Sequence, residues 1–157
     1  MKQLIILIII FPLITFGQIE KSKYEIVIGY IVDSIIKNDF GKFHISNSIA
    51  RKTEFADFHG LSQNCEIQHK LLLEILLKGE QSKIKESKLS GLIPGEYKIE
   101  SNNRKVEFGT IITYKNIWAT VIIIRNNSTQ EYEWTKHSLL FIDNKLIGKL
   151  IGNWHGD

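Results

Sequence analysis

Hydrophobic residues follow three different spacings along this chain, and each spacing predicts a different structure. An unbroken apolar run extends from Leu4 to Phe16. Two later segments place apolar residues three and four positions apart, which is the spacing of a helix with one buried face. From residue 94 onward, short apolar segments are separated by turn residues, as in β-strands. The chain is therefore expected to form helices first and a sheet afterwards.

The apolar run from Leu4 to Phe16 has the length of a signal peptide. A helix that crosses a membrane needs about 20 apolar residues, and this run is shorter. Lys2 precedes it, and Thr15-Phe16-Gly17 follows with short side chains where a signal peptidase accepts them. We expect residues 1–17 to be a cleaved signal peptide, with no stable membrane span after cleavage. An uncleaved signal anchor is the alternative.

The junction of the expected signal with the mature chain points to a bacterial source. A signal that ends in Phe16-Gly17-Gln18 resembles those of the Bacteroidetes. The chain contains 28 Ile but only 3 Ala, a ratio that an AT-rich genome would produce through its codons. The expected location is therefore periplasmic or extracellular.

Charge and cysteine content narrow the class of protein. The net charge is +3, and the two signs are mixed along the chain without a basic block. Nucleic acid is therefore not an expected partner. The single cysteine, Cys65, cannot form an intramolecular disulfide, so residues 18–157 must be stabilised as a single domain by their hydrophobic core.

Two helices are expected in the first half of the mature chain. The first covers residues 24–36, where Tyr24, Val27, Ile28 and Ile31 begin one apolar face. The second covers about 64–78, with Asn64 as its N-cap and Gly79 as a left-handed C-cap. Leu72 and Ile75 belong to its buried stripe, which Leu73 and Leu77 widen. The Lys-rich residues 80–91 between the second helix and the strands are expected to form a solvated loop.

The second half of the chain is expected to be a meander of strands. Pro94-Gly95 predicts a type II turn, and a further short strand is suggested at Lys42–Ile45. The expected strands of the meander are 97–100, 105–114, 117–125, 131–142 and 145–152, with two-residue turns at Lys115-Asn116 and Asp143-Asn144. The fold class is α+β, with two N-terminal helices packed on a C-terminal twisted antiparallel sheet of four to five strands.

The alternation of residues along these strands suggests a ligand site. A two-residue turn at Asp143-Asn144 and a five-residue loop at 126–130 would place the candidate ligand-binding residues on one sheet face. These are Arg125, Glu133, His137 and Trp154. In this interpretation His137 acts as an acid or base and Glu133 orients the ligand. The alternative is a half-solvated sheet end with an Arg125–Glu131 ion pair, and the opposite face, with Trp118, is equally plausible as the core.

No catalytic or metal-binding motif stands out. Cys65 and His69 are one helical turn apart and His59 lies upstream, but zinc would need further ligands that the spacing does not provide. Cys65 also aligns with Leu72 and Leu76, which favours a buried structural thiol. We expect no metal, no cofactor and no catalytic residue.

The order of elements resembles the nuclear-transport-factor-2-like superfamily. An N-terminal helix that runs into Asn38-Asp39-Phe40, a second helix and then a meander of long strands carry this resemblance over residues 24–152. The resemblance implies a cone-shaped α+β fold in which a curved sheet wraps a helix and leaves a pocket. Members include isomerases, dehydratases and binding modules, so the resemblance does not choose a function.

The expected function is that of an exported, non-catalytic module that binds a small ligand or another protein. One alternative is a small pocket enzyme of the isomerase or hydrolase type that uses His137. Another is a structural partner of cell-envelope proteins.

Overall fold

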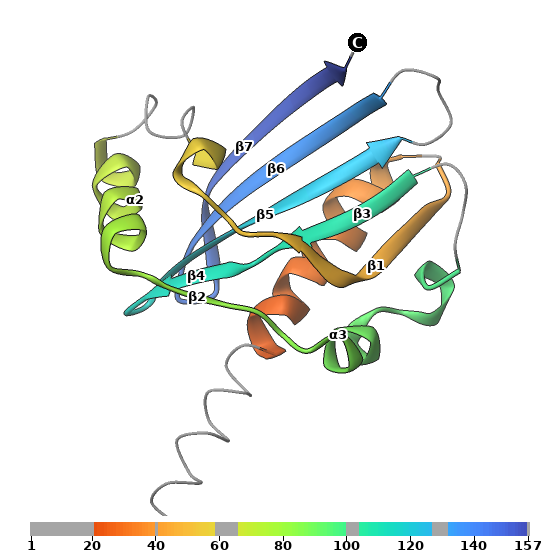
Figure 1. The fold of residues 1–157 in the computed structure, drawn as a ribbon, viewed down its shortest axis with the longest axis horizontal. Helices are drawn as coiled ribbons and strands as arrows, with labels where there is room; N and C mark the ends of the chain where they lie inside the picture. The colour runs from red at the N-terminus through yellow and green to blue at the C-terminus, as the bar shows by residue number, and fades with distance from the viewer. Residues whose placement is uncertain (1–20, 40, 59–65, 100–103, 127–131, 157) are drawn as a thin grey trace, which may run out of the picture.

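The protein has an α+β fold in which a curled seven-stranded sheet carries helices on both faces (Figure 1). The computed structural model describes residues 21–39, 41–58, 66–99, 104–126 and 132–156, without the side chains of residues 55, 66–68, 132 and 154–156. The expected fold class is thus confirmed at this level. The sheet is larger than the four to five strands expected, because two further segments pair with the meander.

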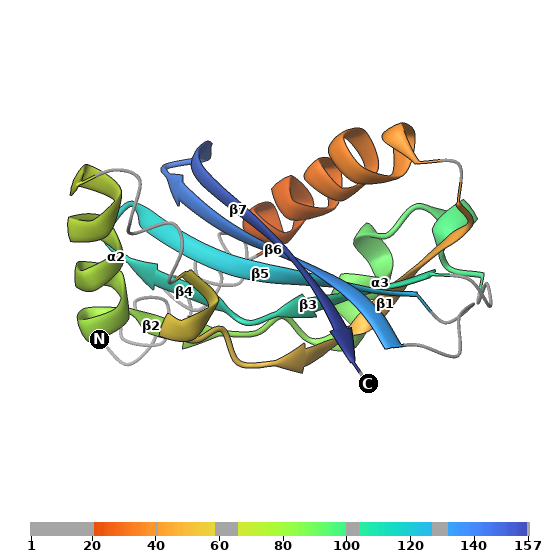
Figure 2. The ribbon, with the colours of Figure 1, turned by 90° about the horizontal axis from the view of Figure 1, so that it is seen from above.

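The N-terminal helix, residues 21–38, follows the predicted apolar face. It is α-helical over residues 21–30, continues as a π-helix at Ile31–Ile35 (η1) and ends as a 3₁₀ turn at Ile36–Asn38 (η2). Tyr24, Val27 and Ile31 are fully buried. The helix ends because Asp39 is extended, with φ −132° and ψ 133°. Figure 2 shows this helix lying over one face of the sheet.

The second half of the chain forms the predicted antiparallel meander, except that the strand predicted at 105–114 is divided at Thr110 into two strands that both pair with the next one. Its strands are β3 (Arg104–Gly109), β4 (Ile111–Tyr114), β5 (Ile117–Asn126), β6 (Tyr132–Ile142) and β7 (Lys145–Gly156). Both predicted two-residue turns are confirmed. Lys115 and Asp143 adopt the left-handed conformation, with φ of 54° and 53°, which a tight hairpin turn requires.

Two strands outside the meander enlarge the sheet. β1 (Phe43–Arg51) runs parallel to β3 and is longer than the strand suggested at 42–45. β2 (Glu80–Ser82) pairs antiparallel with β4. Parallel pairing of β1 was not predicted, because its partner lies far along the chain and sequence alternation does not identify partners.

The register between β5 and β6 differs from the predicted one. Asn126 pairs with Glu133, which leaves the segment 127–132, an even number of residues, between them, whereas the predicted loop at 126–130 was odd. A change of the register by an odd number of residues moves every side chain of one strand to the other face of the sheet. Even positions of β5 and odd positions of β6 therefore share a face, and the predicted grouping of Arg125 with His137 is wrong.

The register between β6 and β7 is also interrupted. Phe141 pairs with Leu146 as the two-residue turn requires, but Leu140 pairs with Gly148. The extra residue forms an irregularity in β7. Beyond it, His137 pairs with Ile151, whereas an uninterrupted two-residue turn would pair it with Leu150, so the predicted face is wrong for most of β7 as well.

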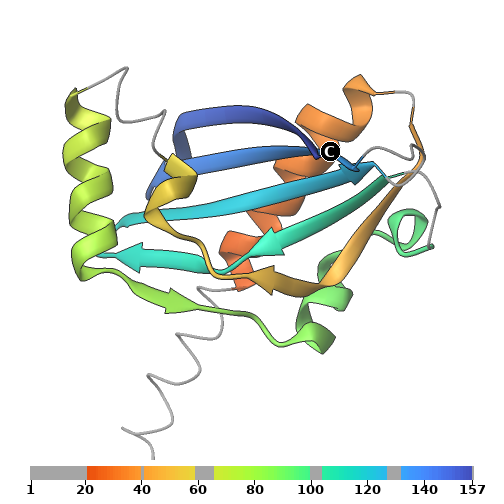
Figure 3. The same cartoon turned by 45° about the horizontal axis from the view of Figure 1, so that its top comes forward.

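Both faces of the sheet are buried, which answers the question of which face forms the core. The N-terminal helix packs on the face of Trp118, Ile122 and Leu139. On the other face, α2 (Glu66–Lys78) and the 3₁₀ turn η3 (Phe55–Phe58) pack on Ala119, Val121 and Leu140. Figure 3 shows α2 at one end of the sheet, across the strands.

The helix α2 confirms the predicted stripe only in part. Leu72 and Ile75 are 1% and 0% exposed, but Leu73 and Leu77 are 38% and 79% exposed and do not widen the stripe. Gly79 has a negative φ, so the predicted left-handed cap is wrong. A Cβ atom there would lie 2.2 Å from the Ile75 carbonyl oxygen, so close packing is the reason for the glycine. The predicted N-cap, Asn64, lies outside the described residues.

The segment expected to be a solvated loop is structured. It contains β2 and a short helix, α3 (Glu86–Leu92), in which Leu89 is fully buried against the N-terminal helix side of the core. Ile84 and Ile93 flank the helix and are also buried. These three apolar residues stand isolated among polar residues and lysines. They are too few to show the regular spacing from which a helix could be predicted.

The predicted turn and strand after α3 are wrong. Pro94 is followed by a 3₁₀ turn, η5 (Gly95–Tyr97), and Gly95 does not have the positive φ of a type II turn. Lys98 is helical in conformation and Ile99 is 72% exposed, so the described part of residues 97–100 forms no strand. Within the described residues, no helix is long and apolar enough to cross a membrane.

Candidate functional site

Two of the four predicted ligand residues lie together. Glu133 and His137 line one pocket of about 290 Å³ between the end of the N-terminal helix and the sheet. The other residues that line it are Ile35, Asp39, Phe43, Arg104, Ile124, Asn126 and Thr135. We call this the His137 pocket. It exists because alternation along β6 turns residues 133, 135 and 137 toward the face that the helix covers.

His137 forms a pair with Tyr30 of the N-terminal helix. The Tyr30 hydroxyl lies 2.9 Å from Nδ1 of His137, and the two rings meet edge to face with centroids 5.9 Å apart. Burial, together with the positive charge of Lys149, lowers the pKa of His137 to about 4. Burial also raises the pKa of Tyr30. Both side chains are therefore neutral near pH 7, and the pair is a neutral hydrogen bond.

An ion pair stands beside this histidine. Arg104 on β3 donates to the carboxylate of Asp39, which follows the N-terminal helix, and its guanidinium lies 5.5 Å from the centre of the Phe43 ring. Asp39 also accepts a hydrogen bond from the backbone N–H of Gly41 at 3.0 Å. These contacts fix the helix end against the sheet at the edge of the pocket.

Arg125 does not line the His137 pocket, and the side chain of Trp154 lies outside the described part of the structure. Arg125 lies on the opposite face, where its Nε is 2.7 Å from Glu107, and Lys105 reaches the same carboxylate at 3.0 Å. Burial alone would raise the pKa of Glu107, but the hydrogen bonds from Arg125 and Lys105 outweigh it and lower that pKa. The backbone of Trp154 pairs with that of Trp134. The suggested partner of Arg125, Glu131, lies outside the described residues.

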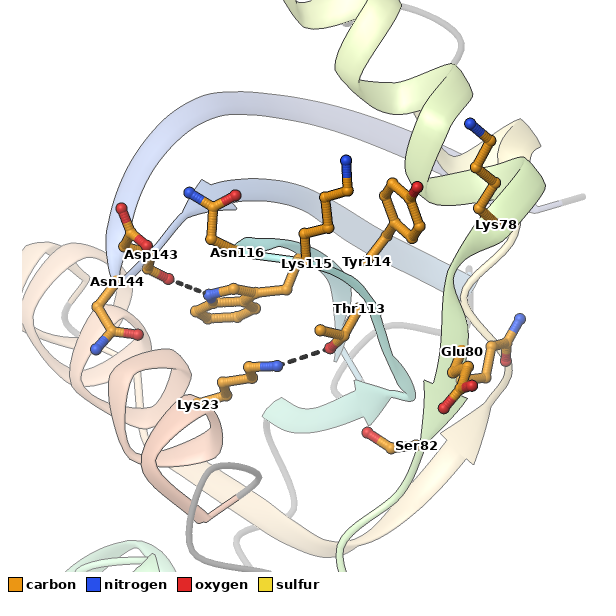
Figure 4. Close-up of a pocket in the computed structure, with 12 residues that line it drawn as sticks. Lys23, Lys78, Glu80, Ser82, Thr113, Tyr114, Lys115, Asn116, Asp143 and Asn144 are labelled. Carbon is orange, nitrogen blue, oxygen red and sulfur yellow. Dashed lines mark hydrogen bonds between the residues drawn. The ribbon is translucent and has the colours of Figure 1, made fainter. Parts of the chain in front are cut away.

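A larger cleft lies at the other end of the N-terminal helix. Its volume is about 820 Å³, and we call it the lysine cleft (Figure 4). It is lined by Lys23, Lys78, Glu80, Gln81, Ser82, Thr113, Tyr114, Lys115, Asn116, Trp118, Asp143 and Asn144. These residues come from the N-terminal helix, the end of α2, β2, β4, β5 and the two hairpin turns. Sequence patterns did not reveal the cleft, because its residues come from separate segments that meet only in the folded structure.

Lys23 is the buried cation of the lysine cleft. Only 8% of it is exposed, and its Nζ donates to Thr113 Oγ1 at 2.7 Å. The same Nζ lies 5.9 Å from the centre of the Trp118 ring. Trp118 is held in turn by a stack on Phe141, with centroids 3.8 Å apart, and by its indole N–H, which donates to the Asp143 carbonyl. This side of the cleft is thus fixed by packing and hydrogen bonds.

Two exposed cations flank Tyr114 at the rim of the cleft. The Nζ of Lys78 lies 5.6 Å from the centre of the Tyr114 ring, and that of Lys115 lies 5.2 Å from it. A lysine over an aromatic face is attracted by the ring's quadrupole. Among the described residues, the lining carries three lysines against two carboxylates, Glu80 and Asp143, and this part of it is net positive.

The buried charges elsewhere form a satisfied structural cluster. Asp57 accepts hydrogen bonds from Arg51 at 3.0 Å, from Lys136 at 3.1 Å and from the backbone N–H of Glu54 at 2.8 Å. Ser138 donates to the Asp57 carbonyl. With its oxygens engaged by two cations and a backbone donor, Asp57 fixes η3 on the sheet.

The residues discussed for metal binding do not form a described site. Cys65 and His59 lie outside the described residues, and His69 is exposed on α2. Among the described residues, no group of three or more His, Cys, Asp or Glu side chains is placed to hold a metal ion.

Comparisons with known proteins do not assign a function to either pocket. No protein-family model matches the sequence, and neither a curated protein nor a solved structure is significantly similar to it. The resemblance to the nuclear-transport-factor-2-like superfamily stays a prediction.

Proposed function

We propose that this protein is a non-catalytic module that binds a small ligand in the lysine cleft. The observation that carries the proposal is the lining itself: three lysines and two aromatic rings converge from separate elements on a space of about 820 Å³. Ligand pockets in proteins measure about 300–1,000 Å³ and combine apolar surface with a few placed polar groups. The lysine cleft has both features.

The lining favours recognition over chemistry. The side-chain amides of Asn116 and Asn144 add hydrogen-bonding capacity beside the lysines, whereas the amide of Gln81 is bonded to Thr53 and Thr110. The Ser82 hydroxyl donates to the Ile111 carbonyl at 3.5 Å, an interaction that does not activate it as a nucleophile.

A direct test compares compounds of every charge class. A panel of anionic, neutral and cationic metabolites can be screened by thermal shift, and each hit mapped by ¹H–¹⁵N chemical-shift perturbation. We expect hits to perturb Thr113, Lys115 and Asn144. Hits that perturb only residues distant from the cleft, or a panel without hits, would contradict the proposal.

A second candidate function is catalysis in the His137 pocket. The contact of Tyr30 with His137, and the presence of Glu133 in the same pocket, favour it. Against it, an acid or base works best when its pKa is near the operating pH, and the pKa of His137 is lowered to about 4. An activity with an acidic optimum that His137→Gln abolishes would favour the enzyme over the binding module.

We also propose that the protein is exported. The support is the apolar run Leu4–Phe16, with Lys2 before it and Gly17-Gln18 after it. Mass spectrometry of the protein from its native host should find a chain that begins at Gln18. Intact residues 1–17 in the membrane fraction would favour the signal anchor instead.

A further inference from the structure

We infer that the ligand of the lysine cleft is a small organic anion with two separated acidic groups, such as a dicarboxylate. This inference rests on the proposed function and adds the chemical class of the ligand. It follows from where the cations of the cleft lie and from how each is held.

The cations occupy two different places. In Figure 4, Lys23 extends from the side of the N-terminal helix, whereas Lys78 and Lys115 lie with Tyr114 at the opposite rim. Thr113 lies between these two places. A ligand with a single compact charge would contact one place, and a ligand with two separated charges would contact both.

The inner place is prepared for one anionic group. Lys23 is a nearly buried cation, and its contacts with Thr113 and the Trp118 ring hold the ammonium at the wall of the cleft. A charge in such a position acts through less water than a surface charge, so its interaction with an anion is stronger. The hydrogen bond to Thr113 also means that little side-chain freedom is lost when an anion binds.

The outer place is prepared for a second anionic group. The ammonium groups of Lys78 and Lys115 both lie within 5.6 Å of the centre of the same ring. The two lysines come from the end of α2 and from the β4–β5 turn, so Tyr114 brings together cations from distant parts of the chain. A carboxylate at the rim would be attracted by both.

The acidic residues of the cleft limit the size and charge of the ligand. Glu80 and Asp143 reduce the net charge of the described lining residues to that of one cation. A long polyanion would bring further negative charges near these carboxylates, and like charges at short range cost free energy. A small dianion uses the three lysines and leaves the carboxylates to contact solvent or the ligand's neutral groups.

The experiment measures binding of defined probes to the purified protein. Malonate, succinate, glutarate and adipate vary the separation of two carboxylates, whereas butyrate, succinamide and inorganic phosphate serve as single-charge, neutral and compact-charge probes. Calorimetric titration gives the affinities, and chemical-shift mapping locates each probe. We expect one dicarboxylate to bind at least about tenfold more tightly than butyrate, because a hydrogen bond to a charged group contributes that order of affinity.

Charge-neutral variants test the outer place. Lys78→Gln with Lys115→Gln should make the best dicarboxylate bind no more tightly than butyrate. Lys88→Gln with Lys98→Gln is the matched control, because it removes the same charge from exposed lysines outside the cleft lining. The control should keep the preference for the dicarboxylate.

Three outcomes would overturn the inference in different ways. If neutral compounds bind in the cleft and dicarboxylates do not, the ligand class is wrong but the proposed function stands. If phosphate binds as tightly as the best dicarboxylate, the requirement for two separated groups is wrong. If no compound of any class perturbs the cleft residues, both the inference and the proposed function fail.

Discussion

The hydroxyl of Tyr30 and Nδ1 of His137 lie 2.9 Å apart and join the N-terminal helix to β6 across one face of the sheet. Because His137 is only 7% exposed and its pKa is lowered to about 4, this contact is made by the neutral imidazole. In the unfolded chain the same imidazole has its ordinary pKa of about 6.5. The difference links the stability of the fold to pH.

Acidification is therefore expected to destabilise the protein. Above pH 6.5 His137 is neutral in both states, and between pH 6.5 and 4 only the unfolded chain takes up the proton. The free energy of unfolding should fall by about 3 kcal/mol between pH 6.5 and 4, and the contribution of His137 should not change further below pH 4. Urea denaturation of the protein and of His137→Gln at pH 7, 5.5 and 4 measures the effect. The variant should lose this part of the pH dependence, and parallel curves for both proteins would contradict the assignment.

The Asp57 cluster predicts a large cost when one partner is removed. Asp57→Asn leaves the buried ammonium of Lys136 without its carboxylate, and breaking a buried pair costs about 3–5 kcal/mol. Asp33→Asn is the matched control, because the Asp33–Lys37 pair is exposed and such pairs contribute at most about 1 kcal/mol. Denaturant midpoints compare the two. Similar small shifts for both variants would mean that Asp57 is not held in the buried cluster.

Close packing at Gly79 predicts that even a methyl group is not tolerated there. The added Cβ would lie 2.2 Å from the Ile75 carbonyl oxygen and 2.6 Å from Cγ2 of Ile112, so Gly79→Ala must displace the end of α2 or β4. Gly91→Ala is the control, since nothing lies within 4 Å of its Cβ and alanine favours a helix by up to about 1 kcal/mol. Thermal unfolding should show a lower midpoint for the first variant and an equal or higher one for the second.

The burial pattern of α2 predicts opposite behaviour for two leucines of the same helix. Leu72→Ala should lower the free energy of unfolding by about 2–5 kcal/mol, because Leu72 is 1% exposed. Leu77→Ala should change it by less than about 0.5 kcal/mol, because Leu77 is 79% exposed. Chemical denaturation checks both values, and equal effects would show that α2 does not pack through Leu72.

The sequence alone determined the features that depend on local physical chemistry. The apolar face of the N-terminal helix, the extent of β5 and β6 and the two tight turns at Lys115-Asn116 and Asp143-Asn144 were predicted correctly. Each of them follows from neighbouring residues, because helical and strand periods and turn conformations are set within a few positions of the chain.

Only the tertiary structure decided the features that depend on strand register or on residues far apart in the sequence. The length of the connection before Glu133 puts His137 on a different face from Arg125. The irregularity opposite Leu140 shifts most of β7 relative to β6, and no local pattern fixes either feature. The burial of Leu89 could likewise not be predicted, because its neighbours in the sequence are polar and rich in lysine. The lysine cleft shows the same limit most clearly. Lys23, Lys78 and Lys115 are ordinary residues in their own segments and form a site only because the sheet brings three separate elements to one end.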